Sequence, residues 1–176
     1  VYPSERDPTA LLVAIQQLEA RGHIQAGQFK IRFRAAIHDT LLNALAKSHG
    51  VEAFIETCPP IPYREALAEM LRADGLLVMQ ASNCNEQIPA KIYEYLRARR
   101  PIVGLSDPQG DTAGLLYSAG IDKVARLDSP DAISELILEV LSDETGRLKP
   151  DDAFVESASR YGRTQLLAGH LNSIHS

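Results

Sequence analysis

Apolar residues along the chain follow two patterns that alternate from one end to the other. Short apolar or alternating runs between turn signals predict strands, and apolar residues spaced three or four positions apart predict amphipathic helices. Strands are expected at 29–34, 51–55, 75–79, 101–105 and 123–126. Helices are expected at 8–21, 39–49, 63–73, 89–99, 111–120, 129–142 and 152–174. This alternation predicts an α/β fold, a Rossmann-like, doubly wound parallel sheet with helices on both faces.

The strand expected at 29–34, FKIRFR, has an unusual pattern. Its aromatic and aliphatic residues share one face, and its three cations share the other. A central parallel strand is usually apolar on both faces. The cationic face therefore indicates an exposed surface, a nearby phosphate or a missing neighbouring strand. Arg34 is the last residue of this strand and lies at the end where ligands bind in such sheets.

Composition narrows the class of protein. The chain has 176 residues, of which 45% are hydrophobic and 23% charged, typical of a globular domain. We expect one domain at 1–142, followed by a linker and a helix at 143–176. A net charge of −5 argues against binding to nucleic acid, and no apolar run approaches the roughly 20 residues of a membrane span. Two cysteines, Cys58 and Cys84, suit a reduced cytoplasmic protein.

Several common sites lack their sequence motif. The chain contains no GxGxxG, no P-loop and no GxSxG, which disfavours dinucleotide-binding, NTPase and hydrolase functions. The histidines do not have the spacing of metal ligands, so no metal site is expected.

The loop at 80–88 is the strongest candidate for a ligand site. It follows an apolar strand, contains the polar residues Gln80 and Asn83, and leads directly into a helix N-terminus, where backbone N–H groups can bind an anion. Lys91 lies in the first turn of that helix and could face a ligand phosphate, or it could be a solvent-exposed lysine paired with Glu94. Glu86 and Glu94 could serve as acid and base, contact sugar hydroxyls, or simply be solvated.

The segment from this loop onward resembles the donor-binding domain of a known enzyme family. Residues 89–95, PAKIYEY, match a P-x-K-x-x-E-Y pattern, and Glu86 and Glu94 are separated by seven residues as in that family. The family is the retaining, family 4-like glycosyltransferases (group 1) of the GT-B fold, and the chain resembles their C-terminal half. Residues 4–12, SERDPTALL, resemble its P-E-K-G-x-x-x-L-L stretch, with Arg6 in place of the lysine. Residues 158–162, ASRYG, resemble its closing helix.

The resemblance implies a role for each residue of the candidate site. Glu94 would hydrogen-bond the ribose of a nucleotide-sugar donor, and Glu86 would approach the donor sugar as the catalytic glutamate. Arg6 and Lys91 would face the diphosphate, and the turn at 59–63 would lie against the base. No metal or other cofactor would be required, because the cations and helix N–H groups can stabilise the leaving group. The glycines that follow the first glutamate in the family are replaced here by Gln-Ile-Pro at 87–89.

The resemblance also implies a larger enzyme. It would transfer a sugar with retention of configuration, for example in polysaccharide biosynthesis, using an N-terminal acceptor domain absent from this chain. That domain would bring a peripheral association with the inner face of the membrane. The chain alone is expected to bind nucleotide without turnover. The family's first strand would precede Val1, so the strands at 29–34 and 75–79 should flank a gap. The alternatives are a nucleotide-sugar epimerase and a non-enzymatic signalling domain.

Overall fold

The structure of the protein, a computed structural model, describes residues 6–142 and 145–174. In this part of the chain, five short parallel strands form two sheets. One sheet pairs β1 (Ile31–Arg34) with β2 (Ile55–Cys58). The other has the order β3 (Leu76–Met79), β4 (Ile102–Leu105), β5 (Val124–Ala125). The strand order and directions confirm a parallel α/β architecture.

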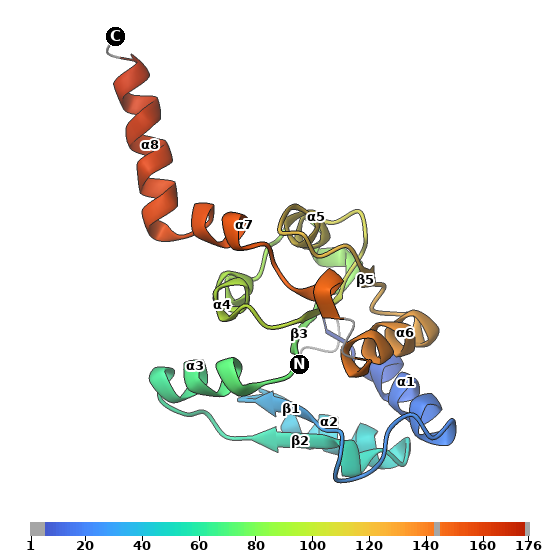
Figure 1. The fold of residues 1–176 in the computed structure, drawn as a ribbon. Coiled ribbons are helices and arrows are strands. Elements are labelled where there is room, and N and C mark those ends of the chain that lie inside the picture. Colours follow the sequence, from blue (N-terminus) through green and yellow to red (C-terminus); the bar gives the residue numbers. More distant parts are fainter. Residues whose placement is uncertain (1–5, 143–144, 175–176) are drawn as a thin grey trace.

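Helices cover both faces of the strands (Figure 1). α1 (Thr9–Ala20) and α6 (Pro130–Leu141) pack against each other on one side. α4 (Lys91–Ala98) and α5 (Asp111–Ser118) lie on the other side of the three-stranded sheet. The remaining helices of the body are α2 (Asp39–Ser48) and α3 (Tyr63–Arg72), with short 3-10 turns η1 (Glu52–Phe54), η2 (Ser82–Cys84) and η3 (Thr145–Leu148). The doubly wound, Rossmann-like arrangement is therefore as predicted.

Two apolar clusters hold these layers together. The larger one joins α1 and α6 to both sheets, and it includes Leu11 of α1, Ile55 of β2 and Met79 of β3. The smaller one lies under α4 and α5 and includes Val78 and Ile92. Along β3, Leu77 and Met79 pack in the larger cluster and Val78 in the smaller one, as expected for a strand that is buried on both faces. The larger cluster links the two sheets into one core.

The two sheets do not pair with each other. β1 pairs only with β2, and β3 only with β4, among the residues that the structure describes. One backbone edge of β1 and one of β3 therefore carry no described partner strand. This matches the expectation that these two strands are not neighbours in a continuous sheet.

The second strand lies later in the chain than predicted. The sequence indicated a strand at 51–55, but that segment forms η1, and the strand β2 follows it. Gly50 adopts a φ of 69° after α2, and the 3-10 turn then buries Val51 and Phe54 completely. Their apolar pattern therefore belongs to a tight turn. Strand β2 ends at Cys58 because the two prolines that follow it lack backbone N–H groups.

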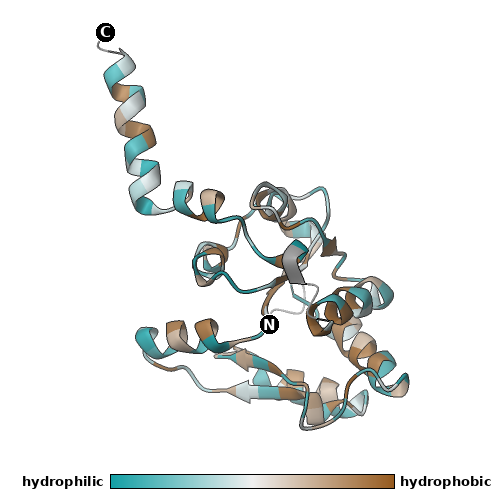
Figure 2. Cartoon of the chain, viewed as in Figure 1, coloured by the Kyte–Doolittle hydropathy of each residue, from teal (hydrophilic) through white to brown (hydrophobic). Residues whose placement is uncertain are grey.

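The C-terminal segment forms two helices instead of the single amphipathic helix predicted at 152–174. α7 (Asp152–Ser157) packs Val155 into the smaller cluster, whereas α8 (Arg160–Ile174) projects away from the body (Figures 1 and 2). The break occurs at Ser159, whose hydroxyl accepts a hydrogen bond from the backbone N–H of Gly162 and so caps α8. Apolar side chains of α8 remain more than half exposed: Tyr161, Leu166, Leu167 and Leu171. No helix in the described ranges combines the length and apolar character that a bilayer crossing needs.

Candidate functional site

The predicted ligand loop lies at the carboxyl end of β3. The backbone N–H of Gln80 still bonds to the carbonyl of Leu105 in β4, and the chain then leaves the sheet through η2 and enters α4 at Lys91. The carboxyl ends of parallel strands are where ligands bind in open α/β sheets. The loop and the first turn of α4 therefore occupy the place expected for a binding site.

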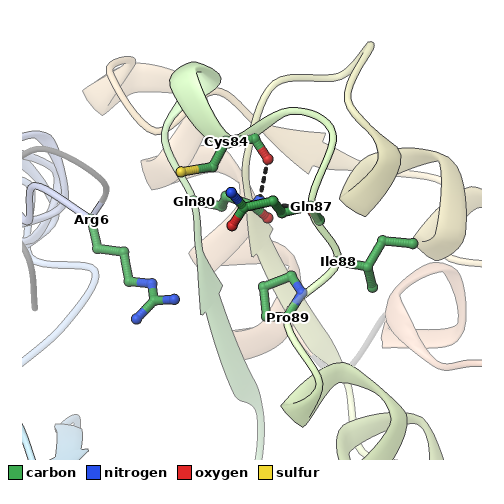
Figure 3. A pocket seen from close by; sticks show the side chains of 6 residues that line it. All are labelled: Arg6, Gln80, Cys84, Gln87, Ile88 and Pro89. Carbon is green, nitrogen blue, oxygen red and sulfur yellow. Dashed lines mark hydrogen bonds between the residues drawn. The ribbon is translucent and has the colours of Figure 1, made fainter.

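Two cations approach this place from different parts of the chain. Arg6, just before α1, extends toward Gln80 and Pro89 and lines a small pocket of about 60 Å³ with them (Figure 3). Lys91, the first residue of α4, is close enough to Arg6 to feel its charge. Neither cation has a carboxylate partner within the described ranges. The pair thus forms a concentration of positive charge that no carboxylate of the described residues neutralises.

Lys91 is held in an environment that disfavours its charge. Burial and, to a smaller extent, the positive charge of Arg6 together lower the pKa of Lys91 to about 8. Its ammonium lies 5.6 Å from the centre of the Tyr95 ring. A cation in the first turn of a helix also opposes the helix dipole. The structure therefore does not contain the Lys91–Glu94 surface pair that the sequence allowed.

Glu94 is engaged by an aromatic residue from a different helix. The hydroxyl of Tyr63, the first residue of α3, donates a hydrogen bond of 3.1 Å to Glu94 Oε1. This contact places the turn at 59–63 beside the first turns of α4. One carboxylate oxygen is thereby oriented, and the half-buried side chain stays next to the turn that was expected to face the base.

Glu86 and Asn83 lie on the outside of the loop. Both side chains are exposed. No hydrogen bond or ion pair engages the Glu86 carboxylate within the described part of the chain, so it is held in place only through the backbone. Hydrogen bonds to the carbonyl of Gln87 and from the side chain of Asn85 hold the backbone on either side of Glu86. They therefore restrict the position of Glu86.

Gln80 is buried, and its amide is fully used inside the loop. Its Nε2 donates to the carbonyl of Cys84 at 2.5 Å and to that of Gln87 at 2.8 Å. Its Oε1 accepts a hydrogen bond from the hydroxyl of Thr112 in α5. Gln80 is 5% exposed. The sequence predicted that Gln80 would contact a ligand directly. In the structure, its amide instead makes hydrogen bonds that hold the loop.

Arg34 lies at the carboxyl end of β1, as predicted, but its guanidinium is already bound. Nη2 lies 2.5 Å from Glu69 Oε2 of α3, and Nη1 donates to the carbonyl of Pro59 at 2.8 Å. Arg32 pairs with Glu56 of β2 at 2.6 Å. Neighbouring carboxylates thus compensate the cationic face of this strand, and Arg34 anchors α3 and the turn at 59–63.

Sequence reasoning missed two residues of the site. Tyr63 and Thr112 are ordinary first-turn residues of helices, and nothing in their local sequence pointed to Glu94 or Gln80. Their partners lie 31 and 32 positions away in the chain, so only the fold brings them together. The described residues contain no group of three or more His, Cys, Asp or Glu side chains that could hold a metal ion.

A second, larger hollow of about 420 Å³ lies beside this site, toward the ends of β4 and β5. Asp107, Arg126 and Asp128 contribute charge to its lining. Arg126 is paired with Asp128 at 2.8 Å, and Asp107 accepts hydrogen bonds from Gln109 and Asn85. Unlike Arg6 and Lys91, each of these three charged groups has a hydrogen-bond partner in the described part of the chain.

Comparisons with known proteins identify the fold. No protein-family model and no curated protein matches the sequence. Among solved structures, WaaG, a glycosyltransferase involved in lipopolysaccharide biosynthesis, is similar with a TM-score of 0.63 and 19% identity, over 93% of this chain and 41% of its own. A point mutant of the O-GlcNAc transferase from Thermobaculum terrenum is similar with a TM-score of 0.60 and 18% identity, over 93% of this chain and 32% of its own. The chain thus has the Rossmann-like fold found in GT-B glycosyltransferases and spans less than half the length of either protein.

Proposed function

We propose that the chain is the donor-binding part of a GT-B glycosyltransferase and binds a nucleoside-diphosphate sugar at the start of α4. The observation that carries this proposal is the pair of unneutralised cations, Arg6 and Lys91, at a helix N-terminus beside the carboxyl end of β3. Burying an uncompensated ammonium is costly, and a diphosphate would supply the missing negative charge. Both named structural neighbours are glycosyltransferases, which favours sugar transfer over the epimerase and signalling alternatives.

The remaining contacts suit the other parts of such a donor. Glu94 can accept both hydrogens of a ribose diol, and Tyr63 orients it from the turn that would lie against the base. The exposed Glu86 would approach the sugar. Arg6 and Lys91, at the start of α4, would stabilise the charge that develops on the departing diphosphate. Retention of configuration and an acceptor such as a growing polysaccharide belong to this proposal for the whole enzyme.

A binding experiment tests the proposal directly. Thermal unfolding of the chain is measured with UDP, GDP, ADP, TDP and CMP, without added metal. A nucleotide present at 100 times its dissociation constant stabilises the folded state by about 2.7 kcal/mol. We expect one or two nucleoside diphosphates to do so, and Lys91→Met and Arg6→Gln to weaken that effect.

The matched control is Lys47→Met. Lys47 is an exposed lysine in the last turn of α2, away from the site. Its replacement should leave nucleotide binding unchanged. The proposal would be wrong if no nucleotide stabilised the chain, or if Lys47→Met weakened binding as much as Lys91→Met.

A further inference from the structure

The loop that carries Glu86 is held from inside by a single buried amide. Gln80 donates from Nε2 to the carbonyls of Cys84 and Gln87, which lie on either side of Glu86. Its Oε1 accepts from the hydroxyl of Thr112, a residue that is only 2% exposed, and that hydroxyl also lies 3.0 Å from the carbonyl oxygen of Gln87. The opposite orientation of the amide would place its oxygen against two carbonyl oxygens. The arrangement therefore requires an amide at position 80 and a hydroxyl donor at position 112.

Further bonds tie the same loop to the connection between β4 and α5. The carbonyl of Asn85 accepts from the backbone N–H of Asp111 at 2.8 Å, and its side-chain amide donates to Asp107 at 2.8 Å. Gly110 permits this approach, because a Cβ at that position would lie 3.0 Å from Asn85 Oδ1. Residues immediately before and after Glu86 are thus fixed, while the Glu86 side chain itself is exposed.

We propose that Gln80 and Thr112 are positioning residues for sugar transfer, because they set the backbone on both sides of Glu86. This inference rests on the proposed function. The hydrogen bonds of these two residues, called the Gln80–Thr112 lock below, hold the carbonyl groups of Cys84 and Gln87 on either side of Glu86. Arg6 and Lys91, which would hold the diphosphate, make no hydrogen bond to Gln80 or Thr112 within the described part of the chain. Loss of the lock should therefore affect the chemical step more than donor binding.

The test uses two replacements of Thr112 in the full-length enzyme. Thr112→Ser keeps the hydroxyl donor, and Thr112→Val keeps the shape but removes it. We expect Thr112→Val to lower kcat roughly three- to tenfold, the usual effect of one hydrogen bond, with a smaller change in the KM for the donor. Thr112→Ser should restore most of kcat. In a Glu86→Gln background, Thr112→Val should cause little further loss, because both changes act through the same carboxylate.

Equal effects of the two Thr112 replacements, or additive losses with Glu86→Gln, would overturn the inference. Hydrogen exchange of the backbone amides at 81–88, measured without ligand, gives a second readout. Thr112→Val should speed this exchange, whereas Thr164→Val, at an exposed threonine of α8, should not. Absence of sugar transfer by the wild-type enzyme would count against the proposed function. Unchanged exchange in Thr112→Val would count against the lock.

Discussion

At Lys91, the proposed function and the stability of the fold make opposite demands. Binding of a diphosphate needs the ammonium charge, whereas burial and Arg6 make that charge unfavourable. Burial and the charge of Arg6 lower the pKa of Lys91 from 10.5 to about 8. At pH values below 8 the ammonium is present in both the folded and the unfolded chain, so its full cost reduces stability. Between pH 8 and 10.5 only the unfolded chain holds this proton, and that cost is progressively relieved. Above pH 10.5 the contribution disappears.

We therefore expect Lys91→Met to raise the free energy of unfolding at pH 7 by about 3 kcal/mol, at 1.36 kcal/mol for each unit of pKa. The gain over wild type should shrink steadily from pH 8 to pH 10.5. Urea unfolding at a series of pH values measures it. Lys47→Met, which removes an exposed charge, should show no such trend, and a pH-independent difference for Lys91→Met would contradict the assignment.

The same pKa predicts how binding depends on pH. A diphosphate favours the ammonium form of Lys91, so above pH 8 binding must be accompanied by uptake of a proton. The dissociation constant of the preferred nucleoside diphosphate should rise by up to about fivefold between pH 8 and pH 9. Calorimetry in buffers of different ionisation enthalpy would detect the proton. Lys91→Arg, which stays charged throughout this range, should bind without that pH dependence.

The two glutamates of the site are expected to differ in importance. A charge-assisted hydrogen bond contributes about 1.5–3 kcal/mol, so Glu94→Gln should lower kcat/KM of the full-length enzyme by roughly ten- to a hundredfold. Glu86→Gln should lower kcat/KM less, because the Glu86 carboxylate has no side-chain partner in the described part of the chain. Tyr63→Phe should show part of the Glu94 effect, since it removes the hydrogen bond to that carboxylate. Equal losses for the two glutamates, or a larger one at Glu86, would refute this order.

At the scale of elements, the sequence predicted most helices and strands but misplaced those whose limits depend on tertiary packing. β3 and β4 were recognisable because a strand buried on both faces is continuously apolar. β2 was not, because Val51 and Phe54 have the apolar character of a strand while forming a turn. The position of Lys91 and Glu94 in the first turn of α4 was predicted from the helix start at Pro89, and their role in a site stays a prediction. The bonds of Gln80 to Thr112 and of Glu94 to Tyr63 join distant segments and leave no local pattern.

The corner between α7 and α8 offers a test with an internal control. A Cβ on Gly162 would lie 2.5 Å from the carbonyl oxygen of Glu156, so Gly162→Ala should disrupt the corner. Gly169 lies in the same helix with nothing within 4 Å of an added Cβ, and Gly169→Ala should stabilise α8 by up to about 1 kcal/mol. Hydrogen exchange of α8 amides should become faster in the first variant and slower in the second. Similar changes in both would show that the corner is not constrained.

At the scale of the whole molecule, the described strands are divided between two sheets, and local sequence patterns do not show this division. The β1-β2 and β3-β4-β5 sheets share one apolar cluster, yet no described strand pairs with the remaining edges of β1 and β3. The doubly wound order, taken from the resemblance, predicted this separation. The cationic face of β1 does not result from this separation. Its arginines form ion pairs with Glu56 of β2 and Glu69 of α3, which neutralise their charge.

Unpaired strand edges expose backbone N–H and C=O groups that readily pair with another strand. We therefore expect the 176-residue chain to self-associate as its concentration rises, and light scattering coupled to size-exclusion chromatography would measure its mass. A substitution that tests these edges should not be made at Gly75, next to the start of β3, because an added Cβ would lie 3.4 Å from the Val140 side chain. Arg32→Pro in β1 tests this edge better. The backbone N–H of Ala35 donates to Cys58 of β2, so by alternation the N–H of Arg32 faces the open edge, where proline cannot donate to a ladder. A peptide or longer chain that supplied a parallel strand between β1 and β3 should raise the stability and suppress the association together. A chain that stayed monomeric at all concentrations, and whose β1 and β3 amides were as protected from exchange as those of β4, would show that these edges are already satisfied.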